Sequence, residues 1–147
     1  MAYHRMSRDE WLPFAMSGTR TGKVAVVRAD GTPHVAPIWF LLDSADGVDR
    51  LVFNTGANTV KGKALRRDPR FAMCVDLDEP PYSYAMFYAT ASIVADPAEM
   101  LPWSTRIGAR YMGTERGEEF GRRNAAPGEL LIIAPITKVV AEANIAE

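Results

Sequence analysis

The sequence predicts a mainly β chain of the α+β class: a small antiparallel barrel with a few helices packed on its outside or across one end. The chain reads as about six strand-like runs and two or three helices, joined by short loops. The turns between the first three runs are too short for a helical crossover, which favours antiparallel pairing over βαβ units. We expect a single domain over residues 1–147, because this length is ordinary for one domain.

The N-terminal part predicts a helix followed by a meander of three strands. Ser7 and, three residues later, Glu10 form a capping pair for a short amphipathic helix. Asp30-Gly31 is typical of a hairpin turn, whereas Pro33 and Pro37 argue against regular pairing along the whole second strand. The elements expected here are a helix over residues 7–17 and strands over residues 23–28, 32–42 and 50–54.

The C-terminal part mixes helices and strands. Asp68-Pro69 ends one predicted helix, and Asp96-Pro97 begins the next. The apolar run over residues 71–77 predicts a strand buried on both faces, and Pro135 predicts that the last segment is a strand pair or one bent strand. The other elements expected here are helices over residues 59–67 and 97–111, strands over residues 84–95 and 129–143, and a polar loop over residues 113–128 that can include a short helix.

Composition narrows the classes of function. The net charge of −1 gives no overall field toward nucleic acid or an anionic membrane, so any anion site must be local. The lone Cys74 excludes a disulfide within the chain, and no apolar run reaches the ~20 residues of a spanning helix. No secretory signal is visible, and His4, His34 and Cys74 cannot make a usual zinc site. We therefore expect a cytoplasmic protein without a metal, nucleic-acid or membrane partner.

The stretch from Asn54 to Arg70 carries the strongest binding signal. A predicted strand ends in small and hydroxyl residues, among them Thr55 and Thr59, and a short helix with Lys61 and further cations follows. Composition alone leaves a solvated cationic face and an anion site about equally favoured, and the hydroxyls at the start of the helix favour phosphate. The glycine patterns of a P-loop and of a Rossmann dinucleotide site are both absent from the sequence.

Residues for catalysis are less evident. His34 on a strand and Cys74 in an apolar run fit structural roles, and no serine lies in a Gly-x-Ser-x-Gly elbow. Turn chemistry explains the carboxylates that follow residue 75. Either the protein is not an enzyme, or a bound cofactor supplies the difficult chemistry.

The order of several motifs indicates a family. The chain contains, one after another, Asp-Gly-x-Pro-His, Pro-x-Trp-Phe, Phe-Asn-Thr, Lys-x-Lys-x-Leu-Arg-Arg-Asp-Pro-Arg and a strand ending in Asp-x-Asp. This order resembles the pyridoxamine 5′-phosphate oxidase-like split β-barrel superfamily. The Lys61–Arg70 pattern and the following Tyr82-Ser83-Tyr84 resemble the actinobacterial flavin/deazaflavin oxidoreductases of the B group, which bind the 8-hydroxy-5-deazaflavin coenzyme F-420.

The resemblance implies a homodimer with two cofactor sites at the subunit interface. The residues it places along the cofactor ring are Pro37, Ile38 and Trp39. Those it places at the ribityl chain and phosphate are Asn54, Thr55, Thr59, Val60 and Lys61. Lys61 is the first expected phosphate ligand and Lys63 the second, and Arg66 or Arg67 can reach the acidic glutamyl tail of F-420. The residues expected from the partner subunit are Tyr82, Tyr84 and Met86.

The function implied is an oxidoreductase that uses reduced F-420 to transfer a hydride to an electron-poor small molecule. The alternatives are an FMN-binding oxidoreductase or oxidase of the same fold, and a deazaflavin-binding protein without turnover. A pyridoxamine phosphate oxidase proper has the least support, because the chain lacks cations for two phosphates. Val60 stands where the FMN branch often has an arginine, which favours F-420. The substrate is expected beside Trp103, the loop over residues 113–128 and the second subunit.

Overall fold

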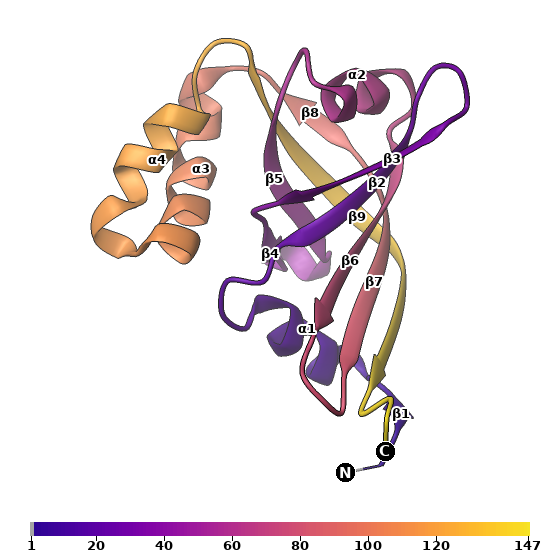
Figure 1. The fold of residues 1–147 in the computed structure, drawn as a ribbon. Helices are drawn as coiled ribbons and strands as arrows, with labels where there is room; N and C mark the ends of the chain where they lie inside the picture. Colours follow the sequence, from indigo (N-terminus) through magenta and orange to yellow (C-terminus); the bar gives the residue numbers. More distant parts are fainter. Residues whose placement is uncertain (1) are drawn as a thin grey trace.

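The computed structural model describes residues 2–147, which form one curled antiparallel sheet with helices around it (Figure 1). The strands are β1 (His4–Arg5), β2 (Gly22–Val27), β3 (Pro33–Ile38), β4 (Leu41–Asp43), β5 (Arg50–Gly56), β6 (Arg70–Leu77), β7 (Ser83–Thr90), β8 (Ser92–Val94) and β9 (Glu129–Ala143). The helices are α1 (Arg8–Met16), α2 (Val60–Arg67), α3 (Pro97–Met112) and α4 (Gly117–Asn124), with short 3-10 turns η1 (Ala45–Gly47) and η2 (Thr114–Arg116). The sheet order is β3-β2-β6-β7-β9-β5-β4, and β1 and β8 also pair with β9. The predicted antiparallel α+β architecture is confirmed.

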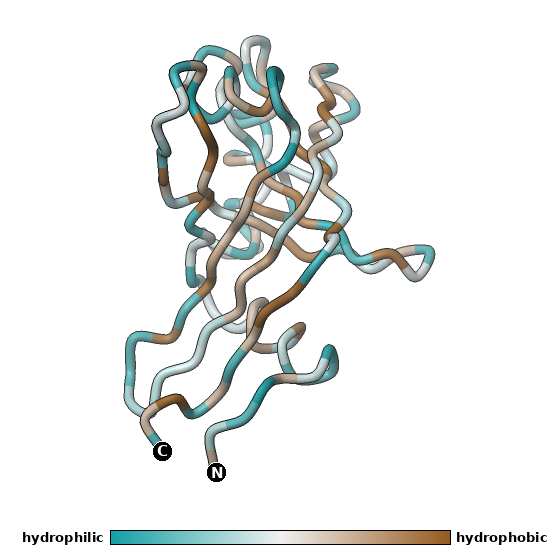
Figure 2. Tube along the Cα trace, turned by 90° about the vertical axis from the view of Figure 1, so that its right-hand side faces the viewer, coloured by the Kyte–Doolittle hydropathy of each residue, from teal (hydrophilic) through white to brown (hydrophobic). Residues whose placement is uncertain are grey.

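Strand β9 joins the two halves of the sheet. Its first half pairs with β5 and β8, and its second half pairs with β7 and β1. Pro135 lies at the change, opposite Arg50. The last segment is therefore one long strand, and the proline is tolerated where the ladder partners change. The two chain ends lie side by side at one end of the sheet (Figures 1 and 2).

The second predicted strand is interrupted, although not at its prolines. β3 ends at Ile38 and β4 begins at Leu41, so that Trp39 and Phe40 lie between them. β3 pairs with β2 alone and forms an edge of the sheet, where prolines are tolerated. β4 pairs with β5 in the other half of the sheet. The break therefore carries the chain from one half to the other and leaves Trp39 free of strand pairing.

The strand predicted over residues 84–95 is divided, which corrects that expectation. β7 and β8 separate at Ala91, whose amide donates to the carbonyl of Pro69, the residue before β6. The register along β9 also shifts between Tyr88 and Ala89. Both pieces pair with β9, so the bulge and the break let the chain follow the curl of that strand.

The expectation that β6 is buried on both faces is wrong for this chain. Phe71, Met73 and Val75 are buried inside the barrel, whereas the alternate Ala72 and Cys74 are only half-buried on the outer face. The run from Phe71 to Val75 is continuously apolar because the side chains on the outer face of β6 are apolar as well as those on the inner face. Within residues 2–147 no helix covers that face of β2, β6 and β7.

Two apolar layers hold the fold together. The larger lies inside the barrel and includes Trp11 of α1, whose ring meets Phe87 edge-on with centroids 5.5 Å apart. The second lies between α3 and the outer side of β5 and β9, and it joins Ile107 to Val52. β5 is thus buried on both faces, with Phe53 inside and Val52 outside. Its end lies between the barrel and the helices.

Residues 113–128, expected to be mainly loop, contain the whole of α4. This helix folds back on α3, and the two pack closely: a Cβ on Gly121 would lie 2.8 Å from the Thr105 Cα atom. The α3–α4 hairpin stands beside the β5 side of the sheet (Figure 1). The hydropathy colours of Figure 2 place most hydrophobic stretches on the strands and most hydrophilic ones in the turns.

Candidate binding cleft

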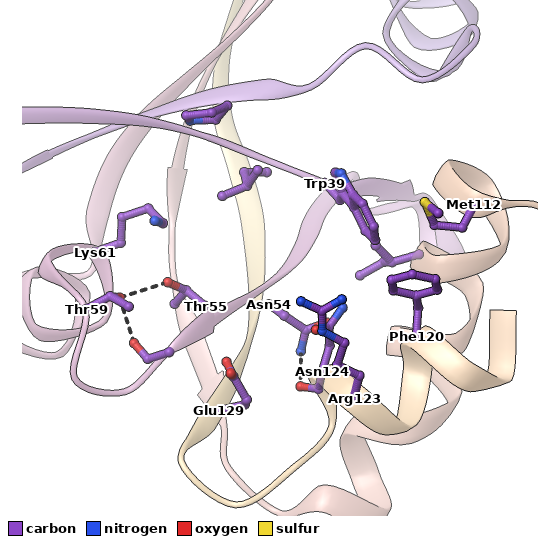
Figure 3. A pocket seen from close by; sticks show the side chains of 14 residues that line it. Trp39, Asn54, Thr55, Thr59, Lys61, Met112, Phe120, Arg123, Asn124 and Glu129 are labelled. Atoms are coloured by element: carbon purple, nitrogen blue, oxygen red, sulfur yellow. Dashed lines mark hydrogen bonds between the residues drawn. The ribbon is translucent and has the colours of Figure 1, made fainter. Parts of the chain in front are cut away.

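A cleft of about 470 Å³ opens where the ends of β3 and β5 meet the start of α2 and the α3–α4 hairpin (Figure 3). It is larger than three other pockets on residues 2–147, which have volumes of about 240, 200 and 400 Å³. Seven of the predicted site residues line it: Pro37, Ile38, Trp39, Asn54, Thr55, Thr59 and Lys61. Segments far apart in the sequence therefore converge on one space.

The hydroxyl end of the cleft is organised around Thr59, which caps α2. Its hydroxyl accepts from the Gly62 amide at 3.1 Å and donates to the Gly56 carbonyl at 2.7 Å. Because that single proton is committed, the 3.1 Å contact between the two threonine hydroxyls has Thr55 as its donor. Gly62 must be a glycine for α2 to approach so closely, since a Cβ there would lie 2.1 Å from the Gly56 carbonyl oxygen.

The predicted cations are divided between two sides of α2. The half-buried Lys61 lies at the cleft, and none of residues 2–147 offers it a hydrogen bond or an ion pair. Val60 and Lys63 face a smaller groove of about 200 Å³ beside the β2–β3 turn. Arg67 lines that groove too and donates to the Val27 carbonyl, and Arg66 is exposed and lines neither space. Only Lys61 of this group is placed to meet a ligand in the cleft.

Asn54 ties the end of β5 to both helices of the hairpin. Its amide nitrogen donates to the backbone carbonyls of Asn124 and Leu130, each at 3.3 Å. Its oxygen accepts from the Ser104 hydroxyl of α3 at 2.9 Å. Ser104 is fully buried and belongs to the apolar contact between α3 and the sheet. Asn54 therefore fixes the distance between the two walls of the cleft.

Trp39 forms an aromatic wall and is held by two other rings. Tyr111 stacks on the indole with centroids 5.2 Å apart and planes at 4°, and Phe120 meets it edge-on at 5.7 Å. The Tyr111 hydroxyl donates to the Arg20 carbonyl at 2.9 Å and accepts from the Phe40 amide at 3.2 Å. Burial raises the pKa of Tyr111, so this hydroxyl keeps its proton and its donor role. The indole is thereby fixed in orientation.

Besides Val60, Lys63 and Arg66, two more of the predicted site residues lie outside the cleft of this chain. Tyr82 is exposed in the turn between β6 and β7, and Tyr84 is at the start of β7. The Tyr84 hydroxyl donates to Glu142 at 3.0 Å, and this contact raises the pKa of Tyr84. Neither tyrosine lines the cleft of its own chain.

Sequence reasoning expected residues 113–128 at the site but did not single out the residues of the helical hairpin that line it. The cleft is also lined by Ile107, Met112, Phe120, Arg123, Asn124 and, from the start of β9, Glu129. The segment over residues 113–128, which was expected beside the substrate, does contribute to the lining. Trp103, which was also expected there, does not line the cleft. The signal that could have found these residues is the spacing of Gly117, Phe120 and Gly121, which are the buried positions of α4.

The cleft has no acid–base–nucleophile set. Its lining residues include no histidine, cysteine or serine. His34 lies outside and contacts Arg28 at 3.1 Å, and burial raises the pKa of the Cys74 thiol, which keeps it from being a thiolate. Among residues 2–147, no three His, Cys, Asp or Glu side chains gather as a metal site. No helix in the same range has both the length and the apolar composition to cross a membrane.

Comparison with known proteins agrees with this architecture. Residues 9–137 match the family model described as pyridoxamine 5′-phosphate oxidase, whereas no curated protein sequence matches the chain significantly. A conserved hypothetical protein from Mycobacterium tuberculosis is 25% identical, with a TM-score of 0.76 over 92% of this chain and 84% of its own. An F420 reductase is 26% identical, with a TM-score of 0.67 over 88% of this chain and 96% of its own.

A third solved structure supports the fold alone. It is a FAD-binding protein from Mesorhizobium loti, 16% identical, with a TM-score of 0.66 over 97% of this chain and 96% of its own. The family model covers nearly all of the barrel and both helices of the hairpin. The chain therefore belongs to the pyridoxamine 5′-phosphate oxidase family and has its split β-barrel fold.

Proposed function

We propose that the protein is an oxidoreductase of the flavin/deazaflavin B group that uses reduced coenzyme F-420 on an electron-poor small molecule. One observation carries the proposal: a single cleft joins an anion-binding end, at Thr59 and Lys61, to an aromatic end at Trp39. A cofactor with a phosphate at one end and a planar ring at the other needs both ends of such a cleft. The similarity to an F420 reductase, at 26% identity over 88% of this chain, supports the choice of cofactor.

The anion-binding end suits a phosphate by its donors. The amides of Val60 and Lys61, at the start of α2, have no acceptor among residues 2–147. Free amides at a helix start carry positive partial charge, and the Lys61 ammonium adds a full charge beside them. Gly56 and Gly62 leave the loop and helix in direct contact, with no side chain filling the approach. Val60 itself adds no charge and points toward the smaller groove.

The absence of a catalytic set in the cleft fits a cofactor that supplies the chemistry. When bound, a reduced deazaflavin supplies a hydride. The residues of this chain would bind and orient: Lys61 the phosphate, Trp39 and its neighbours in β3 the ring. The rings of Trp39, Tyr111 and Phe120 also exclude water from the far end of the cleft.

A homodimer is part of the proposal, and the outer face of the sheet supports it. Val35 is 64% exposed and Val27 is 55% exposed, and both lie in the β2–β3 hairpin. By strand register Ala25 lies opposite Ala72, which lies opposite the exposed Tyr88. Large exposed apolar sheet faces are uncommon on monomers. The strand alternation puts Tyr84 and Met86 on this same face, so a second copy docked there could bring them, with Tyr82, to the neighbouring cleft.

An FMN-binding oxidoreductase is the second candidate. The phosphate end suits FMN equally, and one protein of this fold is described as FAD-binding. Val60 in place of a cation favours the deazaflavin. The third candidate, a deazaflavin-binding protein without turnover, shares the cleft and differs only in activity.

The deciding experiment is to measure the binding of F-420 and of FMN side by side on one preparation. We expect F-420 to bind more tightly, and Lys61→Ala to weaken it about 10- to 100-fold, because a charged hydrogen bond contributes about 1.5–3 kcal/mol. Lys63→Ala removes the same charge from the far side of α2 and should change little. Failure of both ligands to bind would refute the proposal. Binding without oxidation of reduced F-420 across a panel of enones and quinones would favour the third candidate.

A further inference from the structure

A second cation reaches the cleft from the opposite side to Lys61. The exposed side chain of Arg123 extends from α4 into the cleft, where Figure 3 shows it in front of Asn54 and below Trp39. Its guanidinium carbon lies 5.6 Å from the centre of the Phe120 ring. The proposed binding of a phosphate at Thr59 and Lys61 gives this arginine no role.

Arg123 is left without a partner because the carboxylates of its own helix are already paired. Arg116 holds Glu119 through two hydrogen bonds of 3.0 and 3.1 Å, and Arg122 holds Glu118 through two of 2.7 and 3.1 Å. Within residues 2–147 no carboxylate lies at ion-pair distance from Arg123. The hydrogen bonds from Arg116 lower the pKa of Glu119, and Arg123 is close enough to help lower it, but Arg123 forms no ion pair with that carboxyl.

The surroundings of Arg123 define what it can bind. Ile107, Met112 and Phe120 supply apolar surface, and Trp39 supplies a flat ring that is fixed in orientation. The side-chain amide of the neighbouring Asn124 is also without a hydrogen-bond partner in the described chain and lines the same space. One guanidinium fork beside apolar walls matches a single carboxylate on a flat apolar body, because the fork pairs with both carboxylate oxygens.

We propose that Arg123 binds the carboxylate of the substrate, and that the substrate class is planar conjugated carboxylic acids whose body packs against Phe120 and the apolar lining at Met112. This inference rests on the proposed function only in calling the acid a substrate, because the carboxylate site itself requires no cofactor. Glu129, the carboxylate in the same lining, lies opposite Gly56 in the strand register and forms no ion pair with Arg123. The cleft thus has two anion sites, one for the phosphate of a cofactor and one for an acid.

The test uses cofactor-free protein and two probes of equal shape, 2-naphthoate and the neutral 2-naphthamide, followed by tryptophan fluorescence and calorimetry. We expect the acid to bind at least about tenfold more tightly than the amide, as a charge-assisted bidentate contact requires. Arg123→Gln should abolish this preference, and Arg123→Lys should keep part of it. Arg122→Gln is the matched control, because it removes an exposed arginine that lies outside the cleft.

The outcomes separate this inference from the proposed function. Equal binding of acid and amide, binding of neither, or an unchanged preference in Arg123→Gln would each overturn it. A loss of F-420 affinity in Arg123→Gln with an unchanged acid preference would assign the arginine to the cofactor instead and also overturn it. If F-420 fails to bind while the acid preference depends on Arg123, the carboxylate site stands and the cofactor proposal falls.

Discussion

At the scale of single residues, the geometry of the cleft depends on an amide with only one possible orientation. Asn54 donates to two carbonyls through its nitrogen and accepts from Ser104 through its oxygen, so exchanging the two ends would break both contacts with the carbonyls, which cannot donate. The resemblance placed Asn54 on the ribityl chain. Its hydrogen bonds show that it first connects β5 to the helical hairpin, and any ligand contact would come in addition.

The substitution Asn54→Asp tests this connection. We expect the free energy of unfolding to fall by about 2 kcal/mol, because a carboxylate of the same shape would face two carbonyl oxygens and leave them unpaired. Urea denaturation at neutral pH measures the change. Asn124→Asp places the same charge in the same cleft on a side chain without hydrogen bonds, and it should cost less than about 0.5 kcal/mol. Equal losses in the two variants would contradict the role given to Asn54.

Single residues also show a limit of the sequence, which does not reveal the direction in which each cation of α2 faces. The stretch from Asn54 to Arg70 was identified as the binding segment, and Thr55, Thr59 and Lys61 do lie together at the cleft. Sequence could not tell that Lys63 faces the other way, since that depends on how α2 is rotated against the barrel. The close contact of Gly62 with Gly56 sets this rotation, and it is a three-dimensional constraint.

At the scale of elements, local signals predicted well and long-range ones did not. The Ser7–Glu10 capping box and the Asp96-Pro97 helix start are both present, because each depends on neighbouring residues. The division of residues 84–95 and the single course of β9 depend on the curl of the whole sheet. The sequence allowed only a short helix within a loop at α4, because half of the residues of α4 are charged and its packing uses glycines against α3.

The position of α2 gives a prediction that reverses the usual rule for helices. Glycine to alanine inside a helix ordinarily stabilises by about 1 kcal/mol. We expect Gly62→Ala instead to destabilise by about 1–3 kcal/mol and to weaken binding of a phosphorylated ligand, because the new methyl group would push α2 away from Gly56. Thermal melts and ligand titration measure both effects. Arg66→Ala, exposed on the same helix, should leave both nearly unchanged, and a more stable Gly62→Ala protein would refute the prediction.

At the scale of the whole molecule, the ordered motifs predicted the split barrel because each one marks a fixed place in it. The turn Asp30-Gly31 lies at the β2–β3 hairpin, and the cationic stretch begins α2. The apolar run of β6 was interpreted as buried within the chain, yet one side of it faces outward. A sequence shows that a strand is apolar on both sides without showing whether its own chain or a second copy covers the outer side.

A second copy is the covering that fits this face best. The outer side of β2, β3, β6 and β7 carries alanines, valines and a tyrosine at its centre, and the Lys23–Asp76 ion pair lies at one end. Such an apolar centre with charges toward the margin is typical of subunit interfaces. A face-to-face pairing of identical sheets would bury it on both copies at once.

The substitution Ala25→Arg tests that pairing, because Ala25 is exposed on a central strand of this face. We expect the wild-type protein to sediment at twice the mass of one chain and Ala25→Arg to sediment as a monomer, since a charge buried against its own copy is strongly unfavourable. Val48→Arg, an exposed apolar residue next to η1 and away from this face, should leave the mass unchanged. If the partner also supplies Tyr82 and Tyr84 to the cleft, the monomeric variant should bind the cofactor more weakly while its own chain stays folded by circular dichroism. A wild-type protein that sediments as a monomer, or an Ala25→Arg variant that remains a dimer, would show that this face has another use.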